Sequence, residues 1–300
     1  MGARDGRERT AERLLQSSAD KFYDPAVDID WSAPIEPDKY YLPEHRISLY
    51  GTALWDRMTP EQRFELGKQE IASITSFGIF AEVGLMHMLL NTIAEGDPTS
   101  RHAQYALTEI ADECRHSTMF GRSLEKFGVR PFLLPRRVRV LQRIASLIPT
   151  GPAMYGGALL IEEMIDRLQR ETMADENMQP HIRMVNRIHV LEEARHITYA
   201  REELRRLMPR LGPVLRALNR VGLALAAWGA ARVLIDPRAY KRAGLDPWEA
   251  RKAALANPHY RESVRWMGER LVRFLDEAGM IKGRVTTALW RRSFLLGGRV

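Results

Sequence analysis

Two pentapeptides, residues 112–116 (DECRH) and 192–196 (EEARH), decide how this 300-residue chain folds. Each joins an acid and a glutamate to an arginine and a histidine, and each lies in a run of apolar residues at helical spacing. A glutamate and a histidine three residues apart share one face of an α-helix. A charged group on an inward face costs several kcal/mol unless it is paired or bound to a metal. The pentapeptides therefore predict two helices that carry metal ligands into one core.

Each pentapeptide follows a segment that carries a glutamate on its apolar face. Glu82 interrupts the first of these faces and Glu162 interrupts the second. Glu163 has Arg167 and Arg170 four and seven residues further on, which is typical of a solvated row of ion pairs. We therefore expect Glu162 to point inward and Glu163 to face solvent.

The second pentapeptide is extended by His189, so three ligand types stack on one helix face at positions i, i+4 and i+7. A glutamate plus Glu-x-x-His, occurring twice, is the arrangement of dinuclear carboxylate bundles. Four carboxylates neutralise two divalent cations, and oxygen-rich ligation with imidazole favours iron or manganese over zinc. The candidate metal ligands and catalytic residues are Glu82, Glu113, His116, Glu162, His189, Glu193 and His196.

The acids that precede the ligand glutamates have two possible roles. Asp112 and Glu192 are placed to accept the distal N–H of a ligand histidine, with Arg115 and Arg195 closing this outer layer. The alternative is surface salt bridging along each helix. Glu109, one turn before the first pentapeptide, is a further candidate for the outer layer.

Proline and capping residues place the helices. The capping box at 59–62 opens a helix to about residue 94, and later signals predict helices over 99–128, 152–176, 179–208, 213–235, 247–256 and 259–278. The fold class is therefore all-α, a ferritin-like four-helix bundle with an N-terminal arm and a C-terminal helical extension. We expect an irregular arm over 1–58, the metal-binding bundle over 59–210, and an extension over 211–300 packed on it as one unit.

The composition excludes several classes of protein. The net charge is +7, but the basic residues are spread over helix faces without a nucleic-acid-binding motif. The longest apolar run, 221–231, is too short for a transmembrane helix, and the charged N-terminus is not a secretory signal. The single cysteine, Cys114, cannot form an internal disulfide and is expected to be buried. A cytoplasmic location is the expectation.

The full ligand order resembles that of a known family. Glu82, Glu113-x-x-His116, Glu162 and His189-x-x-x-Glu193-x-x-His196 are similar to the four glutamates and three histidines of the p-aminobenzoate N-oxygenase (AurF) family of diiron arylamine oxygenases. The resemblance covers roughly residues 60–210. His189 is the residue that exceeds the six-ligand pattern of ordinary ferritin-like diiron proteins.

This resemblance implies a homodimeric non-haem diiron monooxygenase. Its cofactor would be two iron ions, Fe²⁺ or Fe³⁺ with oxo or peroxo bridges, with manganese as a possible replacement for one or both. It would use O₂ to oxidise an aromatic amine to the hydroxylamine, nitroso or nitro product. The electrons would come from a separate donor such as an acidic ferredoxin, because the sequence has no flavin or nicotinamide fingerprint.

Three other functions stay open at this point. A diiron hydroxylase or desaturase that acts on carbon uses the same ligand set. A ferroxidase or iron-handling protein uses the same bundle, although the third histidine argues against it. A helical scaffold with a buried polar network is the last alternative.

The substrate is not identified by the sequence. We expect its pocket between the second and third long helices, with Tyr155, Gly156 and Gly157 at the entrance or with the glycines only permitting close packing. The apolar helix over 221–235 is expected either at a dimer interface or beside an apolar substrate.

Overall fold

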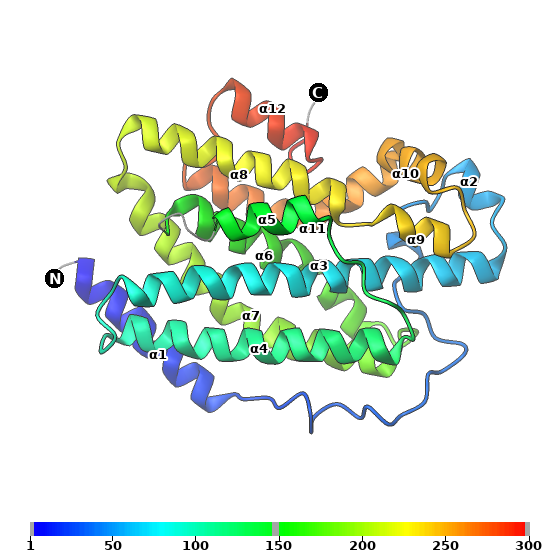
Figure 1. Ribbon diagram of the computed structural model, residues 1–300, viewed down its shortest axis with the longest axis horizontal. Coiled ribbons are helices and arrows are strands. Elements are labelled where there is room, and N and C mark those ends of the chain that lie inside the picture. The colour runs from blue at the N-terminus through cyan, green and yellow to red at the C-terminus, as the bar shows by residue number, and fades with distance from the viewer. Residues whose placement is uncertain (1–2, 146–149, 298–300) are drawn as a thin grey trace.

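Four long helices form the centre of the molecule (Figure 1). The computed structural model describes residues 3–145 and 150–297. The four helices are α3 (Pro60–Ala94), α4 (Arg101–Lys126), α6 (Pro152–Ala174) and α7 (Pro180–Leu207). α3 packs on α4 and α6 packs on α7, while contacts of α4 with α7 and of α3 with α6 close the bundle. The predicted all-α fold is confirmed, and the described residues contain one isolated β-bridge, Tyr40 to Met178, and no strand.

The bundle helices begin where their capping residues predict. The Thr59 side chain accepts a hydrogen bond from the backbone N–H of Gln62, and the Gln62 side chain accepts one from the N–H of Thr59. Ser100 caps α4 in the same way, through the N–H of Ala103. Proline occupies a first-turn position of α6 and α7, where its missing N–H is not needed.

The N-terminal segment corrects one prediction. Residues 1–58 do not form a wholly irregular arm, because α1 (Ala3–Asp20) is an 18-residue helix packed against α4 and α7. Side-chain hydrogen bonds to α7 hold α1 in place. Arg7 Nε donates to Glu203 Oε1 at 2.9 Å, and Thr10 Oγ1 donates to Glu202 Oε2 at 2.8 Å. After α1 the chain is a loop that contains the short helices η1 (Glu44–Arg46) and α2 (Ala53–Asp56).

The C-terminal third covers the α3 and α6 side of the bundle. After η2 (Met208–Arg210) it forms the helices α8 (Pro213–Val233), α9 (Pro237–Arg242), α10 (Pro247–Ala256), α11 (Pro258–Glu277) and α12 (Arg284–Arg292). α8 and α11 pack on α6, and α9 packs on α3. Three of these helices match the predicted ranges, whereas α9 and α12 were not predicted.

The connection between α4 and α6 contains α5 (Arg136–Ala145), a helix that was not among the predicted ranges. None of its residues is buried. The Gln142 side-chain amide ties it to α3 by donating to the Phe80 carbonyl at 2.8 Å.

Two segments, Pro60–Ala94 and Pro213–Arg242, have the length and composition of membrane-crossing helices. Their most apolar windows are 44% and 33% buried within the molecule. Core helices of soluble proteins meet the same criteria, and α3 is one of the four bundle helices. The expectation that no segment crosses a membrane stays a prediction.

Candidate metal centre

The structure brings all seven candidate ligands together inside the bundle. Glu82 comes from α3, two of the others from α4, Glu162 from α6 and the remaining three from α7. Their donor atoms form three overlapping groups, each with its atoms within 4.8 Å of one another: Glu82, His116, His189 and Glu193; Glu113, His116, Glu193 and His196; Glu82, Glu113 and Glu162. Every member is buried. Overlapping groups of this kind suit two neighbouring metal ions that share carboxylates.

Two of the histidines are held by an acid from the opposite pentapeptide. His116 Nδ1 faces Glu113 at 3.0 Å, and its Nε2 lies 2.8 Å from Glu192 Oε2. His196 Nδ1 lies 2.9 Å from Glu113 Oε1, and its Nε2 lies 3.2 Å from Asp112 Oδ2. In each case Nδ1 points into the cluster and Nε2 points to an acid on the other helix, so these acids orient the two rings.

The arginines of the pentapeptides surround these two acids. Arg115 pairs with Asp112, and Arg195 Nη2 lies 3.4 Å from Asp112 and 3.8 Å from Glu192. Asp112 and Glu192 are themselves buried. Of the two roles that the sequence left open for these acids, the geometry supports the outer layer around the ligands and not a solvated row on the surface.

The third histidine is held differently. His189 Nδ1 lies 3.0 Å from Gln169 Oε1, so Nδ1 carries the proton and donates to this amide oxygen. Its Nε2 then carries no proton and has a lone pair for a metal ion. This atom faces Glu82 and Glu193, each at 3.5 Å. Gln169 is a site residue to which the sequence analysis gave no role, although it lies on the face of Glu162 two turns further on.

Unsatisfied polar atoms show that the residues fit a metal centre. His189 Nε2, Glu82 Oε2 and Glu162 Oε2 are all buried and have no hydrogen-bond partner among the described residues. Buried polar atoms are normally paired, because an unpaired one loses its bonds to water without replacement. Three such atoms in one cluster of carboxylates and imidazoles match what iron or manganese binds.

The four glutamates of the cluster divide into two pairs by pKa. Burial, reinforced by neighbouring carboxylates, raises the pKa of Glu82 and of Glu162 well above the usual value. Burial also acts on Glu113 and Glu193, but contact with the histidines outweighs it. The pKa of Glu113 is therefore lowered to about 2, and that of Glu193 falls well below its usual value.

The three histidines of the cluster also differ in pKa. Burial lowers the pKa of His189 to about 4, whereas carboxylate contacts overcome burial and raise the pKa of His116 and His196 well above the usual value. Without a metal, the cluster thus holds protons on two carboxyl groups and two imidazoles up to a higher pH than these groups ordinarily do. The charge of these four protons equals that of two divalent cations, so metal ions and protons compete for this centre.

Two predictions about neighbouring residues are wrong. Glu163 is buried, not solvated, because Arg201 of α7 approaches it and donates from Nε at 3.0 Å. Arg170, its expected partner, instead bonds to Asp166 at 2.9 Å. Cys114 is exposed, because it lies about 100° around the helix from the inward-pointing Glu113.

Glu109 is buried and belongs to none of the three ligand groups. Its Oε2 has no partner among the described residues, and burial raises the pKa of its carboxyl group well above the usual value. His196, Glu113 and Glu193 of the cluster all act on its pKa, and its role in the outer layer stays a prediction.

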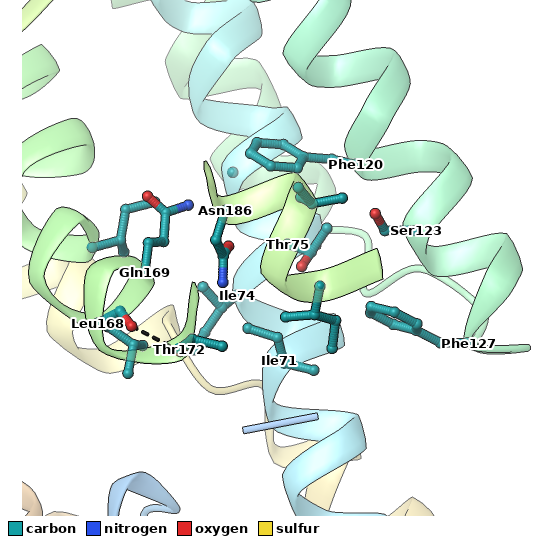
Figure 2. A pocket seen from close by; sticks show the side chains of 14 residues that line it. Ile71, Ile74, Thr75, Phe120, Ser123, Phe127, Leu168, Gln169, Thr172 and Asn186 are labelled. Atoms are coloured by element: carbon teal, nitrogen blue, oxygen red, sulfur yellow. Dashed lines mark hydrogen bonds between the residues drawn. The ribbon is translucent and has the colours of Figure 1, made fainter. Parts of the chain in front are cut away.

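A pocket lies beside the centre, within the bundle (Figure 2). Its 14 lining residues come from all four bundle helices, and Phe120 contacts the His189 ring with centroids 5.0 Å apart. The lining includes residues of α4 and α6, the second and third long helices, as expected, but also residues of α3 and α7, and it does not include residues 155–157. Tyr155 packs against Tyr199, and Gly156 allows close approach of Leu223, where a Cβ would lie 2.6 Å from a methyl group.

Comparison with known families identifies the chain. A family model described as "P-aminobenzoate N-oxygenase AurF" matches residues 4–279. The chain belongs to the AurF family. This confirms the resemblance found in the sequence, extends it well beyond residues 60–210, and makes the protein an oxidoreductase, a diiron oxygenase. Its cluster accordingly has the ligands for a cofactor of two metal ions.

Relatives of this AurF-family chain occur in mycobacteria. The uncharacterised protein Rv0885 of Mycobacterium tuberculosis (strain ATCC 25618 / H37Rv) is 27% identical over 291 residues, 93% of this chain and 84% of the relative. The uncharacterised protein Mb0909 of Mycobacterium bovis (strain ATCC BAA-935 / AF2122/97) has the same identity and coverage.

Among solved structures, the chain is similar to R2-like ligand-binding oxidases. One, with an aerobically reconstituted Mn/Fe cofactor after a long soak, is 13% identical with a TM-score of 0.46, over 96% of this chain and 88% of the other. Another, with its metal cofactor after photoconversion, is 13% identical with a TM-score of 0.43, over 96% and 89%.

Proposed function

We propose that this protein oxidises an aromatic amine at nitrogen, using O₂ and a diiron centre. The observation that carries the proposal is His189, the seventh donor, whose free Nε2 joins the other six ligands while its ring contacts the pocket residue Phe120. Membership of the AurF family supports the same reaction. The two metal ions, when bound by the seven residues, supply the redox chemistry that activates O₂.

The first oxidation balances with two electrons from outside. An arylamine, O₂, two electrons and two protons give the hydroxylamine and water, and repeated oxidation gives the nitroso and nitro products. The apolar pocket keeps the amine unprotonated, because burial disfavours the charged form, and the nitrogen lone pair stays available for the new N–O bond. Gln169 fixes the His189 ring so that its Nε2 faces the centre.

The electron donor and the assembly are part of this proposal. A separate reductant supplies the electrons, and the net charge of +7 suits an acidic redox protein. The protein is a homodimer, for which the exposed apolar residues Val214, Leu218 and Leu225 on α8 support a contact between copies. Mass measurement by analytical ultracentrifugation tests the assembly directly.

The test compares the wild-type protein with His189→Ala, each loaded anaerobically with iron and then supplied with O₂, a chemical reductant and an arylamine. We expect the wild type to bind two irons per chain and to form N-oxidised products that carry ¹⁸O from labelled O₂. His189→Ala should stay helical by circular dichroism and lose this product by at least 100-fold, because one metal loses a ligand.

Other outcomes would replace the proposal. Hydroxylation of the ring carbon without N-oxidation would favour the carbon hydroxylase. Rapid iron oxidation with no organic product would favour a ferroxidase. Full N-oxygenation by His189→Ala would contradict the role given to the third histidine.

A further inference from the structure

The pocket extends from the metal centre in one direction along the bundle. Its lining residues lie before the ligands in α3 and α7 and after them in α4 and α6, at 71–78, 182–186, 120–127 and 165–172. α3 and α4 are joined by a short turn, as are α6 and α7, so these four sets meet at one end of the centre. The pocket is thus the bundle interior continued past the metal ligands.

The lining is elongated along the bundle. On α3 it runs from residue 71 to residue 78, which at a rise of about 1.5 Å per residue is about 10 Å along the helix. That is about the length of one benzene ring with a substituent at each end. Phe120, beside His189, and Gly78 flank the end near the metals, where a Cβ on Gly78 would lie 3.4 Å from the Phe120 ring.

None of the 14 lining residues is ionisable. Six are aliphatic, two are phenylalanines, one is glycine, and the other five carry a hydroxyl or an amide. A carboxylate in such surroundings loses its hydration and gains no cation in return, which is strongly unfavourable. The p-aminobenzoate in the family's description has a carboxylate at the end opposite its amine.

Three basic residues next in sequence to the lining are engaged elsewhere. Lys126 Nζ donates to the Trp31 carbonyl at 3.0 Å. Arg170 bonds to Asp166 at 2.9 Å, and Arg183 Nε donates to the Met173 carbonyl at 3.2 Å. None of these three residues lines the pocket.

Two polar side chains of the lining are wholly available to a substrate. The Ser123 and Thr172 hydroxyls donate to carbonyls of their own helices, and Gln169 is used by His189. Within residues 3–145 and 150–297, the side chains of Asn186 and Thr75 form no hydrogen bond. Figure 2 shows both among the apolar residues of the pocket, where they offer a neutral amide and a hydroxyl.

We propose that the substrate is a neutral, elongated arylamine without a carboxylate, held by apolar contacts and by hydrogen bonds to Asn186 and Thr75. This inference rests on the proposed oxidation of an arylamine and specifies its substrate class. The amine lies at the Phe120 end of the pocket, and the far end of the ring carries an apolar or hydrogen-bonding group without charge.

The first experiment measures binding, independently of turnover. Dissociation constants of 4-aminobenzamide and p-aminobenzoate, which have nearly the same shape, are determined by calorimetry at pH 7.5 with metal-free and iron-loaded protein. We expect the amide to bind at least tenfold more tightly in both forms. Equal or tighter binding of p-aminobenzoate would overturn the inference.

The second experiment adds the missing cation. Asn186→Arg and, separately, Thr75→Lys should reverse the preference and tighten p-aminobenzoate binding at least tenfold. Two positions are used because the buried Asn186 tolerates a large side chain less well than the partly exposed Thr75. Gln16→Arg on α1 is the matched control: it adds the same charge on an exposed residue outside the pocket and should leave the preference unchanged. A folded Thr75→Lys protein that still prefers the amide would overturn the inference.

Turnover separates this inference from the proposed function. Tight binding of neutral arylamines without any N-oxidised product would remove the oxygenase proposal and leave the pocket assignment standing. Efficient N-oxidation of p-aminobenzoate, with tighter binding than the amide, would support the oxygenase and overturn the neutral-substrate inference.

Discussion

At the scale of single residues, the acids that hold the ligand histidines are open to direct test. Asp112→Asn and Glu192→Gln each replace a carboxylate that faces the Nε2 of a histidine from the other pentapeptide. An amide is a weaker acceptor and makes the ring less basic. We therefore expect each change to weaken iron binding about 10- to 100-fold, measured by competition with a chromogenic chelator.

The matched control for these two acids is Glu125→Gln, which removes one charge from an exposed residue of α4. It should leave iron affinity within twofold of the wild type. If Glu192→Gln also left iron affinity unchanged, its contact with His116 would be structural only.

Gln169 gives a second prediction at this scale. Gln169→Leu removes the acceptor of the His189 Nδ1 proton and leaves a buried donor unpaired, a loss of about 1–3 kcal/mol of stability. We expect two irons still to bind but product formation per iron to fall at least tenfold, because the ring is no longer fixed. Gln169→Glu, which restores an acceptor, should recover part of the activity. No recovery would argue that the leucine substitution acts only by disturbing the pocket.

The clustering of the seven candidate ligands was predictable because helical spacing places a charged residue on a buried face, where only pairing or a metal makes it tolerable. The errors came from partners on other helices. Glu163 was assigned to solvent from arginines on its own helix, whereas Arg201 of α7 is its actual partner. Gln169 had no local signal at all, since an uncharged amide on a buried face is unremarkable until His189 is seen beside it.

At the scale of helices, α1 depends on contacts that its own sequence does not reveal. It is strongly polar, and of its apolar residues Ala11 and Leu14 are buried. Arg7→Ala removes the hydrogen bonds to the buried Glu203 and leaves this carboxylate with Arg206. We expect the free energy of unfolding to fall by about 1–2 kcal/mol, measured by urea denaturation. Arg13→Ala, an exposed change on the same helix, is the control and should have little effect.

The contrast between α1 and α3 shows what sequence can predict about elements. α3 has a capping box and a long apolar face, both local, so its ends were predicted almost to the residue. α1 is followed by a proline-rich loop and lacks such a face, so the first 58 residues were interpreted as irregular. Its helix is stabilised by packing on α4 and α7, which lie far from it along the chain.

At the scale of the whole molecule, metal and pH should act together on stability. The raised pKa values of Glu82, Glu162, His116 and His196 mean that the folded, metal-free protein holds these protons more tightly than the unfolded chain. Their contribution is complete below the unfolded pKa values of 4.5 and 6.5 and is lost as pH rises towards the folded values.

We therefore expect the melting temperature of the metal-free protein to fall between pH 6 and pH 8.5. The difference in melting temperature between the iron-loaded and the metal-free protein should increase over the same range. The reason is that metal ions replace the protons and bind more tightly as pH rises. Differential scanning calorimetry of both forms over this range is the measurement. A metal-free protein whose stability rose with pH would contradict the proton assignment.

In each pentapeptide the histidine contacts an acid of the other pentapeptide, and this arrangement has a consequence for biosynthesis. Because each of the two histidines is oriented by the opposite segment, neither half of the bundle can prepare its own metal ligand. The emerging chain therefore has no competent iron site until the second segment has docked on the first. Iron therefore binds only after the bundle has assembled. A truncated or misfolded chain does not bind the metals and so does not generate damaging oxidants.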